Sequence, residues 1–457
     1  NITGPVEIAK VHTKGSSAAG IAFQGSGSEA VIDGSLTISN VDGDKAEKQG
    51  RYIGVSGIRM TGDNTSMTVT GPVNISGFKG SALHTAGADS VISVGGGTIS
   101  TAADADKSHN FYAARVEKGT VNINMKNGAP GSARTNIIGD MYVTGQYGKK
   151  VIEYSGGQLA DWQHRGNLHV ALTDKDSSWT GVAAYEQYND NYGSGGNTMH
   201  DIGNFDLYLQ NGATWTNEQQ SHVTTTTLAG KNPVYNGSYL MKLHGGSDAV
   251  HKGYIYQKDS KPITVDNYSG HTLVFYDHTG DGSAAENYSA GDFRIKTAEE
   301  GSSITLRTGA GGINTADKTA AGKALNSLAN KLYYMSYAQG DTKLKGTVEI
   351  AEGLTSSSVS ASGDIAFRTD TAADKNGQGT YVYEPEEPLD GPIIKDRLLK
   401  GETTVTADDT HAEDGYVSAA YNGDDSITVD MANHGLRLEA ASSASAKAAA
   451  VRVGKGT

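Results

Sequence analysis

The chain has 457 residues, with 60 glycines, 8 prolines, no cysteine and a formal net charge of −13. The absence of cysteine excludes structural disulfides and zinc–thiolate sites, and the acidic balance argues against a nucleic-acid groove or an anionic membrane surface, which need clustered Lys and Arg. Hydrophobic residues make up 37% of the chain, which is low for a compact enzyme of this length and favours an elongated repeat with a narrow core.

A six-residue phrase that opens with glycine and then alternates apolar and polar residues recurs along the chain. It occupies Gly4–Ala9, Gly34–Ser39, Gly71–Ser76, Gly95–Ser100, Gly119–Asn124 and Gly346–Ala351. The first five copies start 30, 37, 24 and 24 residues apart, which is typical of stacked supersecondary units. Alternation with period two predicts short strands that bury one face.

Two further strand-like pieces precede most copies of the phrase. One group opens with Ser28, Ser66 and Ser90, and the other comprises Gly20–Phe23, Gly57–Met60, Ser81–His84 and Ala113–Val116. Three short strands per turn, separated by Gly, Asn, Asp and Ser corners, predict an all-β chain folded as a right-handed parallel β-helix, a solenoid with loop insertions. Residues 1–134 are the regular rungs, and Asp42–Gly50 is a predicted insertion at a corner.

Residues 135–312 are predicted to continue the β-helix as aromatic-rich rungs with loop insertions. Alternating strand-like runs persist at 136–138, 141–143, 167–172, 204–209, 239–243, 272–276 and 303–306. All three tryptophans and 14 of the 23 tyrosines lie between Tyr142 and Tyr288. These aromatic side chains either fill a wider core, which is the favoured interpretation, or stack against sugars or a protein partner on the surface.

One aromatic segment is too polar and glycine-rich for a core strand. Tyr185, Tyr188 and Tyr192 belong to a stretch that ends in Gly193–Gly196. We expect this stretch to be an exposed aromatic loop, and the three tyrosines are the candidate ligand-binding residues.

Residues 313–384 are predicted to contain one amphipathic helix and then returning rungs. Apolar residues at steps of four and three from Ala321 to Met335 predict a helix near 317–335, which Asn314, Thr315 or Asp317 can cap. The phrase then returns at Gly346, and Ile365–Phe367 repeats the pattern of Ile21–Phe23. Proline and acidic residues at 385–400 predict a linker, because no central strand could contain them.

Residues 401–457 are predicted to start a second β-helical unit. The last nine residues, 449–457, repeat the pattern of 112–120 and stop where the Val-Asn-Ile strand should follow. We therefore expect the chain to be cut from a longer array.

The known enzyme motifs are absent from the sequence. There is no Gly-x-Ser-x-Gly elbow, phosphate-binding loop, dinucleotide fingerprint or His-Glu-x-x-His pair, so we predict no catalytic, cofactor-binding or metal-binding residues. Asp277–Ser283 is interpreted as a turn, with a weak Ca²⁺ site as the alternative. The carboxylate pairs Asp104/Asp106, Asp174/Asp176 and Asp424/Asp425 leave one competing function open, a polysaccharide-degrading β-helix enzyme of the lyase or hydrolase class.

The rung phrase, the absent cysteine and the low hydrophobicity make the chain resemble a type Va autotransporter passenger domain, a pertactin-like or AIDA-like β-helical adhesin. Two stretches carry the resemblance further, Gly203–Thr216 with its Asn-Gly-Ala-Thr-Trp sequence and the Thr/Ser-rich rung Gly346–Phe367. The resemblance covers most of 1–384.

This resemblance implies a non-catalytic surface protein that mediates attachment or aggregation. The implied location is the cell surface, with anchoring to the bacterial outer membrane through a C-terminal β-barrel translocator outside these residues. The implied partners are a receptor or glycan on a host or neighbouring cell, with self-association as a further candidate, and no nucleic acid. No serine-protease segment and no Arg-Gly-Asp are present, so proteolysis and integrin binding do not carry over.

Overall fold

The structure is a computed structural model and divides the chain into two units, Asn1–Val382 and Tyr383–Thr457. It describes residues 1–15, 17–43, 47–48, 51–52, 54–101, 111–143, 151–153, 166–190, 197–201, 203–220, 233–369, 376–381, 404–405, 417–419, 428–429 and 451–453. Each unit is considered by itself.

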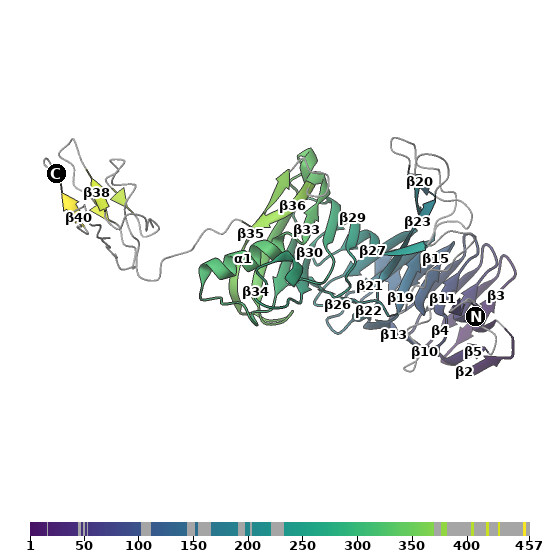
Figure 1. Ribbon diagram of the computed structural model, residues 1–457. Helices are drawn as coiled ribbons and strands as arrows, with labels where there is room; N and C mark the ends of the chain where they lie inside the picture. The colour runs from purple at the N-terminus through teal and green to yellow at the C-terminus, as the bar shows by residue number, and fades with distance from the viewer. Residues whose placement is uncertain are drawn as a thin grey trace. The chain divides into compact units, whose positions relative to one another are not determined.

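The first unit is built mainly from β-strands that lie side by side in one large sheet of many parallel strands (Figure 1). The strands form three columns, within which each strand pairs with the strand one rung earlier and one rung later. Column 1 contains β2 (Val6–Thr13), β5 (Leu36–Gly43), β10 (Val73–Phe78), β13 (Gly97–Thr101), β18 (Thr135–Ile138), β22 (Ser178–Thr180), β26 (Thr214–Asn217), β28 (Gly253–Gln257), β30 (His271–Tyr276), β32 (Ser302–Thr308) and β34 (Leu344–Ala351).

Columns 2 and 3 hold the two other strands of each rung. Column 2 contains β3 (Ala18–Phe23), β8 (Val55–Met60), β11 (Ser81–Thr85), β14 (Tyr112–Val116), β19 (Asp140–Val143) and β23 (Ala183–Asp190). Column 3 contains β1 (Ile2–Thr3), β4 (Glu29–Asp33), β9 (Ser66–Val69), β12 (Val91–Val94), β15 (Thr120–Ile123), β21 (Asn167–Leu172), β25 (Asn204–Leu209), β27 (Pro233–His244), β29 (Ile263–Ser269), β31 (Phe293–Ala298) and β33 (Leu332–Tyr334).

The core of column 1 follows from the copies of the recurring phrase at Gly4, Gly34, Gly71, Gly95 and Gly346, whereas the copy at Gly119 forms β15 of column 3. One row is in register from rung to rung: it runs through the second apolar residue of the phrase at Ile8, Ile38, Ile75 and Ile99, then through Ile137, Trp179, Trp215, Ile255, Val274 and Leu306, and reaches Val348, the first apolar residue of the last copy. From Ile38 onward every member is at most 1% exposed. Because parallel pairing places equivalent residues about 4.8 Å apart, the alternation in sequence becomes a continuous apolar row.

The opening glycine of the phrase has a packing reason. A Cβ atom added to Gly71 would lie 2.6 Å from the carbonyl oxygen of Gly34, and one added to Gly95 would lie 2.6 Å from that of Gly71. Real Cβ atoms do not approach a carbonyl oxygen so closely. The glycines therefore rest on one another at the same corner of successive rungs.

Column 2 is not continued by parallel pairing beyond β23 in the described part of the chain. β23 pairs in antiparallel fashion with β24 (Asn197–Asp201) and with the first half of β27, and β24 also pairs with β20 (Val151–Glu153). From β27 onward the chain alternates between columns 3 and 1 only, from β27 to β28 and so on to β33 and β34. The expectation of three strands in every rung therefore fails for this part of the chain.

One α-helix, α1 (Lys318–Ala329), interrupts the strands of the described residues, and two short 3₁₀ helices, η1 (Ala285–Asn287) and η2 (Met335–Gln339), accompany them. Asp317 caps α1 by accepting hydrogen bonds from the backbone N–H groups of Thr319 and Ala320, at 2.9 and 3.2 Å. The apolar face with Ala321, Leu325 and Leu328 is buried against β32 and β34.

The predicted helix was too long at its C-terminal end. Leu332 is part of β33 and pairs with Phe293 of β31, and Met335 begins η2. Leu332 and Tyr334 are both buried. A spacing of two residues between buried side chains is that of a strand. Leu332 also fits the helical spacing from Ala321, which is why the sequence predicted a longer helix.

Two antiparallel strands close the described part of this unit. β35 (Val359–Thr369) pairs with β34, and β36 (Asn376–Tyr381) pairs with β35 and β33. The phrase at Gly346–Ala351 forms a parallel rung as expected, but Ile365–Phe367 does not repeat the parallel strand of Ile21–Phe23. The connection of only seven residues, 352–358, contains Gly353 at φ +66° and reverses the chain into a hairpin.

Short pairs complete the described elements. β6 (Glu47–Lys48) pairs with β7 (Arg51–Tyr52) in and beside the predicted insertion, and β16 (Met125–Lys126) pairs with β17 (Ala129–Pro130). In the second unit β37 (Thr404–Val405) pairs with β39 (Thr428–Val429) and β38 (Val417–Ala419) with β40 (Val451–Val453), both in parallel. The predicted linker, 385–400, lies outside the described residues.

Candidate ligand-binding surface

The predicted aromatic loop is in part a strand. Tyr185 and Tyr188 belong to β23, and the backbone of Tyr188 lies between Met199 of β24 on one side and Pro233 of β27 on the other. The expectation of a loop was therefore wrong for these two residues. The polar composition of the segment indicated a turn, but strands pair with β23 on both of its edges and satisfy its backbone hydrogen bonds. Tyr192 lies outside the described residues, and a role of the three tyrosines in binding stays a prediction.

Two of the three tryptophans form part of the core. Trp179 and Trp215 are both 0% exposed. Their indole N–H groups donate to the carbonyl oxygens of Gly139 and Gly181, each at 2.9 Å. The favoured interpretation of these side chains as core filling is confirmed, and they are excluded as a surface for sugars. Trp162 lies outside the described residues.

A row of ionisable side chains crosses the outer face of column 3, opposite the buried Leu168 and Phe205. His169 of β21, Asp206 of β25 and Lys242 of β27 are in register. The Nδ1 atom of His169 lies 3.4 Å from Oδ2 of Asp206, and the Nζ atom of Lys242 lies 4.0 Å from the same oxygen. Parallel pairing brings the three together although 73 residues separate the first from the last.

A second row on the same face is aromatic. Tyr208 and His244 are in register, and their rings stack with centroids 4.3 Å apart and an angle of 12° between the planes. The Nδ1 atom of His244 lies 3.1 Å from Oγ of Ser269. Burial lowers the pKa of His244, so the imidazole is neutral near pH 7. Burial, together with the charge of Asp206, raises the pKa of Tyr208.

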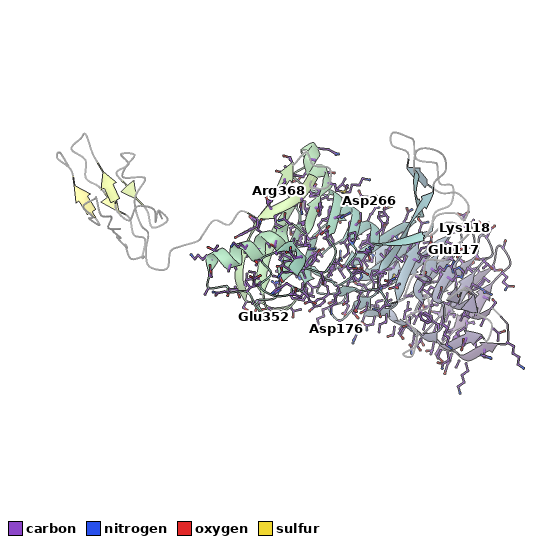
Figure 2. The ribbon with its side chains drawn as sticks, viewed as in Figure 1. Glu117, Lys118, Asp176, Asp266, Glu352 and Arg368 are labelled. Carbon is purple, nitrogen blue, oxygen red and sulfur yellow. The ribbon has the colours of Figure 1, made fainter. Side chains whose placement is uncertain are left out.

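We call His169, Asp206, Lys242, Tyr208 and His244 the column 3 patch. Asp206 is 9% exposed, and its Oδ1 atom has no hydrogen-bond partner among the described residues. A buried carboxylate oxygen without a donor is unfavourable, so this atom favours a hydroxyl, an amide or a water from outside. Tyr239, on the same strand as Lys242, donates a hydrogen bond at 2.8 Å to Asp266 of the next rung, which is labelled in Figure 2. The patch thus combines an aromatic surface with donors and acceptors, the groups that bind polar organic ligands.

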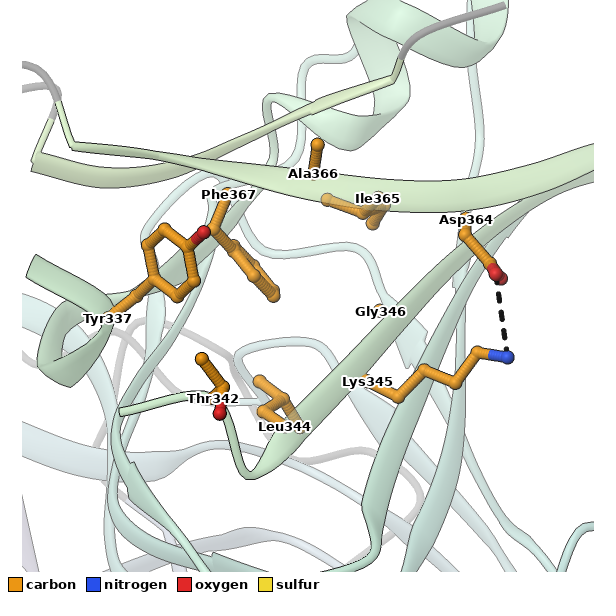
Figure 3. Close-up of a pocket in the computed structure, with 9 residues that line it drawn as sticks. All are labelled: Tyr337, Thr342, Leu344, Lys345, Gly346, Asp364, Ile365, Ala366 and Phe367. Atoms are coloured by element: carbon orange, nitrogen blue, oxygen red, sulfur yellow. Dashed lines mark ion pairs between the residues drawn. The ribbon is translucent and has the colours of Figure 1, made fainter. Parts of the chain in front are cut away.

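A pocket lies where β34 and β35 separate (Figure 3). It has a volume of about 320 Å³ and is lined by Tyr337, Thr342, Leu344, Lys345, Gly346, Asp364, Ile365, Ala366 and Phe367. β34 and β35 pair from Thr347 and Asp364 onward, but Ile365 and Phe367 pair with β36 instead. The Nζ atom of Lys345 lies 3.5 Å from a carboxylate oxygen of Asp364 at the rim. The floor of the pocket is apolar and aromatic, so the pocket fits small apolar groups best.

The segment Asp277–Ser283 is a turn, as favoured from the sequence. The carboxylate of Asp281 accepts hydrogen bonds from the backbone N–H and the hydroxyl of Ser283, at 3.0 and 2.8 Å. Across the described residues, no group of three or more His, Asp or Glu side chains is arranged to hold a metal ion. Asp174 likewise accepts a hydrogen bond from the backbone of Asp176 in a turn, whereas Asp104/Asp106 and Asp424/Asp425 lie outside the described residues.

The sequence contained a partial signal for the column 3 patch. Asn167-Leu168-His169 and Asn204-Phe205-Asp206 share an asparagine, an apolar residue and a polar residue, so His169 and Asp206 could have been aligned. Lys242 lacks this signal, because Leu240 and Met241 precede it where asparagine and one apolar residue precede the other two.

Comparisons with known proteins identified no relative of the chain. No protein family, no curated protein and no solved structure matches the chain. No helix among the described residues is long and apolar enough to cross a membrane.

Proposed function

We propose that the first unit is a right-handed parallel β-helix that serves as the surface-exposed passenger of an autotransporter and acts as a non-catalytic adhesin. The observation that carries this proposal is the in-register parallel pairing of equivalent strands over many rungs, from Ile8 to Val348 in column 1. In such a solenoid each rung contacts only its neighbours, so the array is at once a spacer and an extended binding surface.

The column 3 patch is the binding surface that we propose. Its side chains project from paired strands rather than from loops, so their spacing is set by the rungs and little conformational entropy is lost on binding. An aromatic pair beside a carboxylate, an imidazole and an ammonium group suits a glycan or a polar protein epitope on a host or neighbouring cell. Self-association through the same surface is a further proposed interaction.

Binding is tested with fluorescently labelled chain on cultured cells and on bacteria. The proposal expects saturable binding that Tyr208→Ala weakens, because the half-buried ring that stacks on His244 is lost. Tyr333→Ala is the matched control, since Tyr333 is a half-buried tyrosine on another strand whose ring faces Arg294. A second variant that lacks residues 191–196 tests the predicted aromatic segment. Absence of saturable binding to every cell type would overturn the adhesin proposal.

Surface display is tested separately on intact cells that make the full-length protein. Antibodies against residues 1–382 should label unpermeabilised cells, and added protease should remove the label. Labelling only after permeabilisation would contradict both the autotransporter assignment and the anchoring through a C-terminal β-barrel.

One observation favours a second candidate, a polysaccharide-degrading enzyme. The imidazole of His169 and the ammonium group of Lys242 lie 3.4 and 4.0 Å from one carboxylate oxygen of Asp206, and these three groups together are able to transfer protons. Incubation with acidic and neutral glycans, followed by assays for reducing ends and unsaturated products, separates the two functions. Turnover that Lys242→Met abolishes would replace the non-catalytic proposal.

A further inference from the structure

A row of basic side chains crosses the outer face of column 2, away from the column 3 patch. Arg59 of β8, His84 of β11 and Arg115 of β14 are in register on three successive rungs. The opposite face of the same strands carries Ile58 and Leu83, both 0% exposed. Three basic groups thus lie about 4.8 Å apart from rung to rung in a chain whose net charge is −13.

Arg59 has no carboxylate partner among the described residues. Its Nη1 atom donates to Oγ of Ser17 at 2.5 Å and to the carbonyl oxygen of Gly54 at 3.0 Å. Its Nε–H is buried and has no acceptor. Burial lowers the pKa of Arg59, but a guanidinium stays charged at any ordinary pH. Arg59 is therefore a half-buried positive charge held by neutral oxygens alone.

His84 presents an unpartnered ring nitrogen beside Arg59. The residue is 6% exposed, its Nε2 atom lies 3.3 Å from Oε1 of Glu117, and its Nδ1 atom is buried without a partner. Burial lowers the pKa of His84, so the imidazole is neutral near pH 7. A neutral ring that donates Nε2–H to Glu117 leaves Nδ1 as a bare acceptor.

The charges at this site do not balance. Nη2 of Arg115 lies 2.8 Å from Oε1 of Glu117, which follows β14 and is labelled in Figure 2. Burial disfavours the charged carboxylate, but the hydrogen bond with His84 and the charge of Arg115 outweigh burial and lower the pKa of Glu117 to about 2. Glu117 therefore neutralises Arg115, while the charge of Arg59 remains uncompensated.

We propose that Arg59 and His84 form a binding site for an acidic sugar, a carboxylate-bearing saccharide with a hydroxyl next to the carboxylate. The carboxylate accepts hydrogen bonds from the guanidinium of Arg59, and the hydroxyl donates to Nδ1 of His84. A single negative charge matches the single uncompensated positive charge. An acidic peptide fits less well, because its Asp or Glu side chain carries no donor beside the carboxylate, and a backbone N–H elsewhere in the peptide would have to reach the imidazole. This inference rests on the proposed function and names the class of ligand at a second place on the surface.

Entry of the ligand requires one small rearrangement. The two unpartnered atoms are covered in the free protein, but the contact between Arg59 and Ser17 lies at the surface. Release of that contact frees the guanidinium to turn towards a carboxylate, and a charge-assisted hydrogen bond is the stronger of the two.

Isothermal titration of the purified chain tests the proposal without cells. The probes are a glucuronate oligosaccharide and sialyllactose, which distinguish two sources of a sugar carboxylate, together with lactose, acetate and sulfate. We expect one of the two acidic sugars to bind, lactose not to bind, and acetate and sulfate to bind at least about tenfold more weakly. Arg59→Gln should weaken binding of the acidic sugar by about tenfold or more.

Two controls separate binding from folding. Ser17→Ala removes a neutral partner of Arg59 and keeps the charge, so it should bind at least as tightly as the natural chain. Arg294→Gln removes an exposed arginine from β31 and should change nothing. Melting followed by circular dichroism verifies that each variant is folded.

Three outcomes would overturn the proposal. Arg59→Gln that is folded and binds as well as the natural chain would exclude the site. Equal binding of lactose and the acidic sugars would exclude the role of charge, and equal binding of sulfate or acetate would reduce the site to a simple anion site. None of these outcomes depends on whether the chain adheres to cells, so the proposed function fails or stands by its own test.

Discussion

The indole ring of Trp179 lies flat on that of Trp215, with centroids 4.8 Å apart and 3° between the planes. The two residues are in register on β22 and β26, and they occupy the row that isoleucine fills on the earlier rungs. Two large aromatic rings can replace isoleucine here because they stack along the direction in which the strands repeat, and their N–H groups reach backbone carbonyls one rung back.

Replacing one of these rings should weaken the middle of the first unit strongly. Trp215→Ala leaves a cavity in a fully buried row and removes the hydrogen bond to Gly181, and we expect a loss of about 3 to 5 kcal/mol in the free energy of unfolding. Urea denaturation followed by circular dichroism measures it. Tyr254→Ala, on the next strand but half-buried, is the control and should lose much less. Equal losses for the two variants would contradict the importance of the stack.

A buried ion pair fixes the hairpin at the end of the sheet. Arg307 is 7% exposed, donates to Glu349 from Nη2 at 2.7 Å, and donates from Nη1 to the carbonyl oxygens of Leu354 and Ser356. Glu349→Gln removes the charge that balances a buried guanidinium and should lower the free energy of unfolding by about 3 kcal/mol.

The exposed pair Lys345–Asp364 provides the comparison for this ion pair. Its two side chains are 66% and 69% exposed, so Lys345→Ala should change stability by less than about 1 kcal/mol. Limited proteolysis at 352–358 should accelerate in Arg307→Met, because two carbonyls of that connection lose their donor. Unchanged proteolysis would show that the hairpin holds without Arg307.

Acid should destabilise the first unit through Glu117 and His84, which face Arg59, Arg115 and Lys118. The folded pKa of Glu117, about 2, lies below its ordinary value of 4.5, so its charge stabilises the fold above pH 4.5 and this contribution is lost as pH falls towards 2. The pKa of His84 is also lowered, so protonation of the unfolded chain below its ordinary 6.5 acts in the same direction.

The melting temperature should therefore fall between pH 7 and pH 3. The contribution of Glu117 is at most about 3 kcal/mol. In Glu117→Gln the fall below pH 4.5 should become shallower, whereas in Glu286→Gln, an exposed residue of η1, it should match that of the natural chain. A steeper acid transition in Glu117→Gln would contradict the sign of this argument.

Asn124, the last residue of the recurring phrase at 119–124, is held in the left-handed region at φ +54°. Its side-chain amide donates to the carbonyl oxygens of Gly131, Ala133 and Ala171 at 2.9 to 3.1 Å. We expect Asn124→Ala to cost about 2 to 3 kcal/mol, part from backbone strain and part from the lost hydrogen bonds.

Two further variants separate the cost of backbone strain from the cost of the lost hydrogen bonds. Asn124→Gly removes the hydrogen bonds but relieves the strain, so it should cost less than Asn124→Ala. Asn127→Ala, at an exposed residue with φ +51°, should show the strain alone, about 1 kcal/mol. Equal stability of the three variants, measured by urea denaturation, would exclude both contributions.

Much of the sheet could be predicted because the pattern that marks a strand, alternation of apolar and polar residues, lies within the strand itself. Alternation with period two identified the strands of all three columns, and the isoleucine of the phrase marked the core row. The rule fails where two periods fit the same residues, as at Leu332, and where a short connection reverses the chain, as before Ile365. It also gives no warning that, among the described residues, no parallel strand continues column 2 after β23, since that depends on how later strands pair.

Beyond the shared pattern around His169 and Asp206, the polar surfaces could not be predicted from the sequence, for a different reason. His169, Asp206 and Lys242 are in register although the intervals between them are 37 and 36 residues. A fixed period would miss Lys242 by one residue, and a shift of one residue moves a side chain to the other face of the sheet. Arg59 and His84 are likewise ordinary surface residues in the sequence. That Nε of Arg59 and Nδ1 of His84 have no hydrogen-bond partner becomes visible only when the neighbouring strands are in place.

The glycines that rest on one another at the corner of successive rungs have a consequence for how such a chain can change over time. A side chain at Gly71 would push against Gly34, and one at Gly95 would push against Gly71, whereas duplication or deletion of a whole rung recreates the same contact at its new boundaries. Growth and shrinkage of the array by recombination should therefore be tolerated more readily than drift at this one corner, so that length varies among descendants while the glycine persists.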